Sequence, residues 1–218
     1  MGTGKSTVAA MFRRLGAMVL DADALAHQAM EPKRLAWRYI VKAFGEEILN
    51  EDQTVNRRKL AAVVFQDEDE RKRLEAIIHP QVLRAIKQEL HQLRRSRRVQ
   101  AVVLDVPLLL EVGAKGWVDA LVVVTAPPAV QRERLKRKYA WSDADINARV
   151  AAQWDLSAKE ALADDVVDNS DGVDATRTQV KRIWNQRVLL HRRKTPRGTP
   201  GTAKSRQAPR RRSSTSRP

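Results

Sequence analysis

The chain has 218 residues, of which 43% are hydrophobic and none is cysteine, and its formal net charge is +15. This length and apolar content are sufficient for one hydrophobic core and a small inserted subdomain. Without cysteine, disulfides and thiolate metal sites are excluded, and an intracellular, cytoplasmic protein is expected. No apolar run approaches the roughly 18 residues of a membrane span, so no membrane association is expected.

The positive charge is concentrated at the C-terminal end. Residues 187–218 contain eleven Lys and Arg and no acid, so the body that precedes them carries only +4. A basic tail on a nearly neutral body does not by itself indicate a nucleic-acid-binding surface. Because the tail is rich in Pro, Gly, Ser and Thr, we expect it to be disordered.

The first seven residues contain the second half of a phosphate-binding loop, G-x-x-x-x-G-K-[ST]. Gly2 to Thr7 supply that half, and the apolar-periodic run up to Phe12 predicts the helix that should follow it. In this motif the backbone N–H groups cradle a polyphosphate, the Lys reaches the β- and γ-phosphates, and the next hydroxyl holds Mg²⁺. The alternative is a glycine-rich tail ahead of an ordinary helix. By the motif's spacing, the first Gly and the strand that feeds the loop would precede Met1, so we expect a truncated motif.

A short apolar run follows at residues 17–20 and ends in Asp21-Ala22-Asp23. Carboxylates placed just past the C-terminal end of a strand lie where open α/β sheets build their sites. The alternative is that Asp23 caps the next helix, predicted over residues 24–30. The two acids could also divide these roles between them.

Residues 33–97 contain no convincing strand. Their periodicity predicts helices over residues 35–44, 58–65 and 68–78, and a fourth helix that begins at Pro80 and runs to about residue 95. A helical block of this length between two strands is an insertion and not a simple crossover. The simplest interpretation of basic residues such as Arg58 is that they form a solvent-exposed face. A histidine such as His79 is more often a helix cap or a packed side chain than a catalytic base.

Three further apolar runs predict strands at residues 99–106, 120–124 and 165–168. They alternate with a basic helix over 131–138, a helix from Ser142 to about residue 155, and a terminal helix over 175–190. Nearly uninterrupted apolar strands imply a parallel sheet that is covered on both faces. The order of elements therefore predicts an α/β, three-layer P-loop kinase fold from which the first, central strand is missing.

From about residue 2 to residue 186 the chain resembles the dephospho-CoA kinase family. The resemblance rests on the phosphate loop and on further segments in the family's order: Asp21-Ala22-Asp23, Leu74-Glu75-x-Ile77-Ile78-His79-Pro80, Pro107-Leu108-Leu109-x-Glu111, Gln131-x-x-Arg134, Arg149-x-x-x-Gln153 and Ala163-Asp164-x-Val166-x-x-Asn169. Each segment is weak alone, but together they are specific. The family phosphorylates the ribose 3′-hydroxyl of dephospho-CoA in the last step of coenzyme A synthesis.

The resemblance implies a role for each matching position. Asp23 would be the general base, and Arg134, in a lid at about residues 129–155, would neutralise charge on the transferred phosphoryl group. Lys5 would contact that group, and Ser6 would hold Mg²⁺. The residues implied in ATP binding are Gly2, Thr3, Gly4, Lys5, Ser6, Thr7, Arg137 and Lys138. Those implied in substrate binding are Asp21, His27, Arg58, His79, Pro107 and Glu111.

The implied organisation is a kinase core at residues 1–32 and 98–186, a substrate-binding insert at 33–97 and the basic tail at 187–218. Two departures from the family pattern are His27, which replaces an arginine, and Lys138, which replaces the second lid arginine and lacks its guanidinium fork. Three other hypotheses remain. The chain could be another nucleotide or small-metabolite kinase, a nucleic-acid-binding protein acting through its Arg-rich tail, or a non-catalytic fragment.

Overall fold

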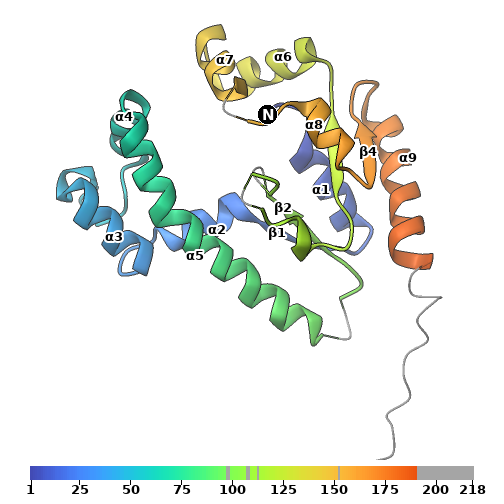
Figure 1. Cartoon of the computed structure of the whole chain (residues 1–218), viewed down its shortest axis with the longest axis horizontal. Helices are drawn as coiled ribbons and strands as arrows, with labels where there is room; N and C mark the ends of the chain where they lie inside the picture. The colour runs from blue at the N-terminus through green and yellow to red at the C-terminus, as the bar shows by residue number, and fades with distance from the viewer. Residues whose placement is uncertain (97–98, 107–108, 112, 152, 191–218) are drawn as a thin grey trace, which may run out of the picture.

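The computed structural model describes residues 1–96, 99–106, 109–111, 113–151 and 153–190. Helices and short parallel strands alternate, as predicted for an α/β fold (Figure 1). The elements of the core are α1 (Lys5–Arg14), β1 (Met18–Asp21), α2 (Ala22–Ala29), β2 (Val102–Asp105), β3 (Val122–Thr125), β4 (Asp165–Asp168) and α9 (Val173–Trp184).

The four strands form two parallel pairs. In one pair β1 lies beside β2, with Leu20 opposite Leu104, and in the other β3 lies beside β4, with Val124 opposite Val167. Among the described residues no strand pairing joins the two halves, and helix α1 contacts β1, β2 and β3. The predicted parallel strands are therefore confirmed, but they do not form one continuous sheet here. That a further strand belongs between the halves stays a prediction.

The main hydrophobic core lies between α1 and α9. Phe12 of α1 packs with Val167 of β4 and with Val180, Ile183 and Trp184 of α9, all buried. These three α9 positions lie on one face of the helix, as expected for an amphipathic terminal helix. The core therefore fixes the helix whose first turn carries the phosphate loop.

A π-helix, Asn185–Leu189, continues α9. Within it Arg187 donates from Nε to Asp165 Oδ2 at 2.7 Å. The predicted tail boundary at residue 187 is thus too early, because residues up to Leu189 are helical and Arg187 is anchored to β4. Residues 191–218, the greater part of the predicted tail, lie outside the described residues.

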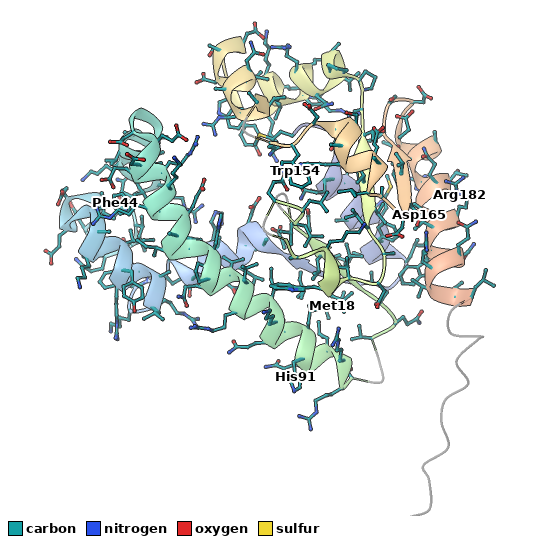
Figure 2. All side chains as sticks on the ribbon, in the orientation of Figure 1. Met18, Phe44, His91, Trp154, Asp165 and Arg182 are labelled. Carbon is teal, nitrogen blue, oxygen red and sulfur yellow. The ribbon has the colours of Figure 1, made fainter. Side chains whose placement is uncertain are left out.

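The insert is helical, as predicted. It contains α3 (Leu35–Phe44), a 3₁₀ turn η1 (Glu46–Ile48), α4 (Arg57–Gln66) and α5 (Glu68–Arg94). Gly45 ends α3 with φ 81°, the left-handed conformation that favours glycine. Figure 2 shows Phe44 in the insert on the opposite side of the molecule from Asp165 in the core.

Helix α5 corrects the prediction of two helices separated at Pro80. It is one continuous helix with Pro80 in its interior. Proline removes one backbone hydrogen bond, but packing on both sides offsets the loss. Before Pro80, Ile77 packs with the insert cluster around Ile40, and after it Ile86 packs against Ala22 of the core. The helix therefore joins the insert to the core.

The lid region contains α6 (Pro128–Tyr139) and α7 (Asp143–Ala151), followed by α8 (Leu156–Ala161). A single helix to about residue 155 was predicted, but α7 ends at Ala151 and α8 is separate. The reason is tertiary packing, because Leu156 packs with the cluster of Leu109 and Leu121 that also includes η2 (Lys115–Trp117). Among the helices of the described residues, none is both long and apolar enough to cross a bilayer.

Candidate active site

The phosphate loop has the backbone geometry of an anion site. Gly2 and Gly4 adopt positive φ values of 72° and 91°, and α1 begins at Lys5 without a side-chain cap. The backbone N–H groups of Gly4, Lys5 and Ser6 donate to no acceptor among the described residues. Unsatisfied N–H groups at a helix N-terminus carry partial positive charge, so they favour a bound anion such as phosphate.

The two acids at the end of β1 divide the roles that the sequence left open. The cap of α2 is Asp21, whose carboxylate accepts from the backbone N–H groups of Asp23 at 2.9 Å and Ala24 at 3.2 Å. Asp23 lies in the first turn and is exposed, and its carboxylate accepts no hydrogen bond from the described residues. The capping alternative for Asp23 is therefore wrong, and its carboxylate stays available to a substrate.

Lys5 lies at the centre of a charged group. It forms an ion pair with Asp105, which is buried at the end of β2. Burial lowers the pKa of Lys5, the charges of Asp23 and Asp21 oppose this shift, and the charge of Lys138 adds to it. The structure thus brings three predicted site residues, Asp21, Asp23 and Lys138, within electrostatic reach of a fourth, Lys5, which also pairs with Asp105. Because the positive charges of Lys5 and Lys138 repel each other, a polyanion bound between them would be favoured.

Arg134 lies against the phosphate loop itself. Its Nη1 donates to Thr3 O at 3.3 Å and its Nη2 donates to Asn169 O at 3.0 Å. The guanidinium therefore joins α6 to the loop and to the end of β4. The side chain of Arg137 is exposed and forms no hydrogen bond or ion pair with the described residues.

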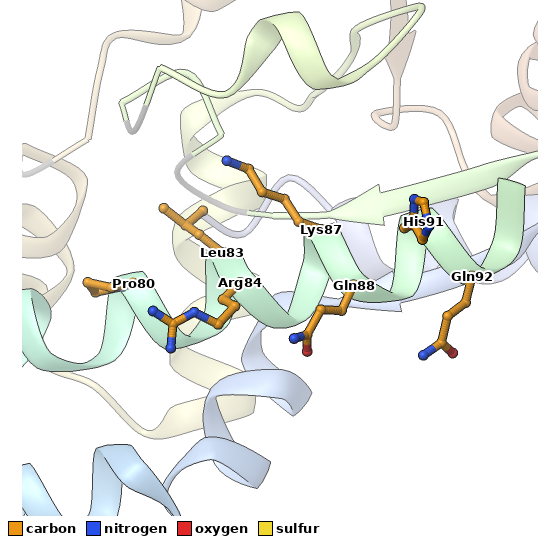
Figure 3. A pocket seen from close by; sticks show the side chains of 7 residues that line it. All are labelled: Pro80, Leu83, Arg84, Lys87, Gln88, His91 and Gln92. Atoms are coloured by element: carbon orange, nitrogen blue, oxygen red, sulfur yellow. The ribbon is translucent and has the colours of Figure 1, made fainter.

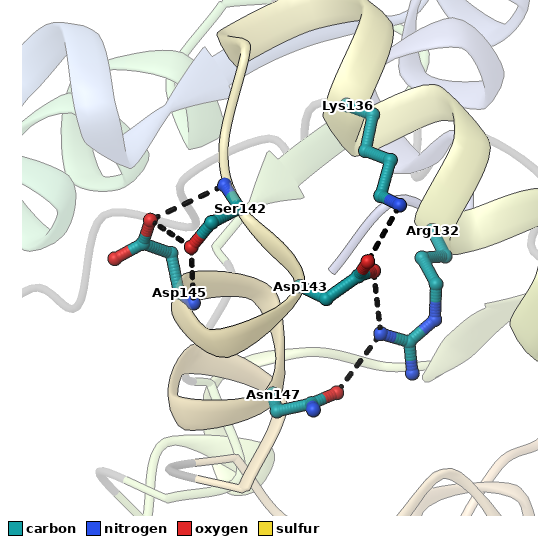
Figure 4. A network of polar contacts seen from close by, with 6 residues as sticks. All are labelled: Arg132, Lys136, Ser142, Asp143, Asp145 and Asn147. Carbon is teal, nitrogen blue, oxygen red and sulfur yellow. Dashed lines mark hydrogen bonds and ion pairs between the residues drawn. The ribbon is translucent and has the colours of Figure 1, made fainter.

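The two lid helices are held together by polar contacts (Figure 4). Asp143 of α7 accepts from Arg132 Nη1 at 3.2 Å and from Lys136 Nζ at 2.8 Å, both on α6. The first turn of α7 is closed by reciprocal hydrogen bonds between Ser142 and Asp145. Arg132 and Lys136 are therefore paired with Asp143 of α7, whereas Arg137 and Lys138 of α6 form no ion pair with the described residues.

The residues predicted to bind the second substrate are more dispersed. His27 is exposed one helical turn after Asp23, and Arg58 is exposed on α4 in the insert. His79 is half-buried on α5, between the segment that packs on the insert and the segment that packs on α2. Pro107 lies outside the described residues.

Glu111 is held in an ion pair with Lys159 of α8, with Oε1 2.7 Å from Nζ. Oε1 also accepts from the backbone N–H of Trp154 at 3.4 Å. Burial raises the pKa of Glu111, but hydrogen bonds from Lys159 and from backbone N–H groups, with the charge of Lys159, outweigh burial and lower it overall. The structure thus gives Glu111 a structural contact through Oε1, whereas its Oε2 is buried without a hydrogen-bond partner among the described residues.

The site offers oxygen donors suited to Mg²⁺. Among the described residues no group of three or more His, Cys, Asp or Glu side chains could hold a metal ion by itself. Mg²⁺, however, is usually held by one or two carboxylates together with substrate phosphates and water. Apart from its ion pair with Lys5, Asp105 Oδ1 has no hydrogen-bond partner. The Asp105 carboxylate and the Ser6 hydroxyl are oxygen ligands of the kind that such an ion prefers.

Sequence reasoning gave no site role to Asp105 or Asn169. Each is a buried polar residue at or just after the end of an apolar strand. That position, which drew attention to Asp21 and Asp23, could have identified these two as well.

A groove lies along one side of α5 (Figure 3). It has a volume of about 710 Å³ and is lined by Pro80, Leu83, Arg84, Lys87, Gln88, His91 and Gln92. Lys87 points toward η2, where its Nζ lies 4.6 Å from the ring centroid of Trp117. None of the lining residues was predicted as a site residue, so the candidate active site rests on the loop and its charged neighbours.

A phosphate loop at the start of α1, parallel strands that end in carboxylates, and a basic helical lid define a P-loop kinase. A family model described as dephospho-CoA kinase matches residues 1–175. The chain therefore belongs to the dephospho-CoA kinase family.

Among curated relatives, the dephospho-CoA kinase of Geobacillus kaustophilus is 42% identical over 186 residues, which cover 85% of this chain and 92% of the relative. That of Anaeromyxobacter dehalogenans is 45% identical over 183 residues, covering 84% and 86%. A crystal structure of TT1252 from Thermus thermophilus aligns with a TM-score of 0.71 and 33% identity, covering 86% and 94%. A dephospho-CoA kinase from Campylobacter jejuni, 23% identical with a TM-score of 0.66 over 88% and 94%, supports the fold.

Proposed function

We propose that the chain transfers the γ-phosphoryl group of Mg-ATP to the ribose 3′-hydroxyl of dephospho-CoA, which yields coenzyme A and ADP. The main support for this proposal is Asp23. Its carboxylate is exposed, accepts no hydrogen bond from the described residues and lies within electrostatic reach of Lys5 in the phosphate loop. A hydroxyl nucleophile needs a carboxylate to orient and deprotonate it, and the phosphoryl group needs cations that stabilise its charge.

In this proposal the backbone N–H groups from Gly4 to Ser6 bind the ATP phosphates. Lys5 exchanges Asp105 for a phosphate oxygen, which frees the Asp105 carboxylate. Ser6 and Asp105 would hold Mg²⁺, which when bound would help to neutralise the β- and γ-phosphates. Lys138 and Arg134 approach from the lid side, and the insert at residues 33–97 binds dephospho-CoA. A cytoplasmic location is part of the proposal.

A coupled assay of ADP release tests the substrate. Dephospho-CoA, adenosine, gluconate and nucleoside monophosphates are compared as acceptors, with the Asp23→Asn variant as the control for enzyme-dependent turnover. A clear preference for dephospho-CoA is expected. A preference for any other acceptor would instead support the alternative of a different small-metabolite kinase. The nucleic-acid alternative depends on a tail that lies mostly outside the described residues, and no structural observation favours it.

A further inference from the structure

The Thr3–Gly4 peptide is held from outside the phosphate loop. Asn169 Nδ2 donates to Thr3 O at 2.8 Å, and Arg134 Nη1 donates to the same oxygen at 3.3 Å. The C=O and N–H of a trans peptide unit point in opposite directions. Because the Thr3 carbonyl is held toward Asn169, the Gly4 N–H of the same peptide must point away from it. That N–H has no acceptor among the described residues, so it is free to donate to a phosphate.

Asn169 reaches the loop because position 4 has no side chain. Gly4 adopts φ 91°, and a Cβ added there would lie 2.0 Å from Asn169 Nδ2. The glycine therefore serves two purposes, the left-handed turn that starts α1 and the close approach of the asparagine amide.

The Asn169 amide is held at both ends, by Thr3 O on the loop side and by Thr176 on the other. Asn169 is 7% exposed and Thr176 is 0% exposed. Thr176 Oγ1 lies 2.9 Å from Asn169 Oδ1 and 2.9 Å from Gly172 O, and its hydroxyl can donate to either. A hydroxyl that donates to Oδ1 leaves Nδ2 directed at Thr3 O. If the amide were reversed, Oδ1 would face the Thr3 carbonyl, and two acceptors would oppose each other without a proton between them.

We propose that Asn169 and Thr176 are positioning residues for ATP, which set the Thr3–Gly4 peptide so that the Gly4 N–H faces the phosphates. Neither side chain touches the reacting atoms in this arrangement. Thr176 orients Asn169, and Asn169 orients the peptide. The inference rests on the proposed function only in taking the anion at this loop to be the ATP phosphates.

Two variants at Thr176 separate the hydroxyl from the shape of the side chain. Thr176→Val keeps the shape and removes the donor, and Thr176→Ser keeps the donor. We expect Thr176→Val to weaken Mg-ATP binding in calorimetry about tenfold, the effect of about one buried hydrogen bond. The KM for ATP should rise in parallel, the KM for dephospho-CoA should stay unchanged, and Thr176→Ser should behave as wild type.

Gln179 offers a matched control on the same helix. Its side chain accepts from Asp168 N at 3.0 Å and donates to Asp168 O at 2.8 Å, so it binds the end of β4 without reaching the loop. Gln179→Leu should leave ATP affinity unchanged. Selective ¹⁵N labelling of the nine glycines gives a direct measure. The Gly4 amide resonance should respond to ATP in wild type and Thr176→Ser, and respond less in Thr176→Val.

If wild type and Thr176→Val bind Mg-ATP equally well, the inference is overturned and the proposed function stands. A wild-type chain without ATP affinity would overturn both. If Thr176→Val does not fold, Asn169→Leu decides, because it keeps the size of the side chain and removes the donor to Thr3 O without adding a charge beside the phosphates. ATP affinity unchanged in Asn169→Leu would also overturn the inference.

Discussion

At the scale of single residues, the site depends on how neighbouring polar groups share contacts. Asp21 satisfies the first N–H groups of α2 and leaves Asp23 without an internal partner. Asp105 pairs with Lys5. A carboxylate that is engaged by the backbone is a poor base, whereas an unengaged carboxylate near the transferred group is suited to that role.

Asp23→Asn should lower kcat by about 10² or more with little change in ATP affinity, because general-base catalysis contributes about 10²–10⁴. Asp21→Asn is the matched comparison. Asparagine caps a helix about as well as aspartate, so this variant should keep the fold and lose much less activity. Steady-state kinetics and ATP titration measure both effects. Near-normal turnover of Asp23→Asn would remove Asp23 from the chemistry.

The Glu111–Lys159 pair predicts a pH dependence of stability. The pKa of Glu111 is lowered in the folded chain, so the folded state favours the ionised carboxylate. The stabilisation is therefore complete above the unfolded pKa of about 4.3 and is lost as the pH falls through the lower, folded pKa. Glu111→Gln should be less stable than wild type at neutral pH, and the difference should shrink on acidification. Thermal melts from about pH 7 to pH 3 measure it. A difference that stays constant over that range would contradict the assignment.

At the scale of elements, local sequence rules predicted most helices and strands, and they failed where distant packing decides. The strand at residues 165–168 and the helix at residues 35–44 have the predicted bounds, since each has its own apolar pattern and boundary residues. Pro80 was expected to begin a helix, but contacts on both sides of it keep α5 continuous. The break before α8 likewise depends on the position of Leu156 against residues more than 30 positions away.

The residues of the site were likewise predictable where a local motif identifies them, and not where their contacts depend on distant packing. The loop motif identifies Gly2 to Thr7, and the acids after β1 are identified by their position. Arg134, in contrast, was expected on phosphate, and its two bonds to backbone carbonyls depend on where α6 lies relative to the loop. A single sequence does not contain that arrangement.

Arg134 and Lys138 make the lid testable. Arg134→Ala should reduce kcat/KM more than Lys138→Ala, because it removes a cation and also both bonds that join α6 to the loop and β4. Lys138→Ala removes a charge near Lys5 and an exposed contact with the Tyr139 ring, and should leave the melting temperature close to that of wild type. Arg134→Lys keeps the charge but cannot form the same fork of bonds, so it should recover little. Equal or reversed effects would transfer the main lid role to Lys138.

At the scale of the whole molecule, the chain has separate hydrophobic clusters for its two proposed binding functions. Phe12 belongs to the cluster of α1, β3, β4 and α9 beneath the phosphate loop, and Phe44 belongs to the cluster within the insert. Helix α5 connects them through Val82 and Ile86, which pack on Ala22 at the start of α2. The residues that support the phosphate loop and those that hold the insert together therefore belong to different packed clusters.

Phe12 and Phe44 are matched probes of this division, because their exposures are 6% and 8%. Truncation of either to alanine should lower the free energy of unfolding by about 3–5 kcal/mol, the usual cost for a buried phenylalanine. Phe12→Ala should also weaken Mg-ATP binding, since Phe12 fixes α1 and therefore the N–H groups of the loop. Phe44→Ala should leave ATP affinity near that of wild type and raise the KM for dephospho-CoA, because the disturbance is confined to the insert.

Thermal unfolding with and without Mg-ATP, together with steady-state kinetics for both substrates, measures these effects. Phe12→Leu and Phe44→Leu are the controls, because a leucine fills most of either space and should restore stability and affinity together. A loss of ATP affinity in Phe44→Ala as large as that in Phe12→Ala would contradict the division, since it would mean that the insert and the loop depend on a single packed unit. The separate response is expected because Phe44 packs with Ile40, Ile48 and Leu60 of the insert, whereas Phe12 packs with residues of the core.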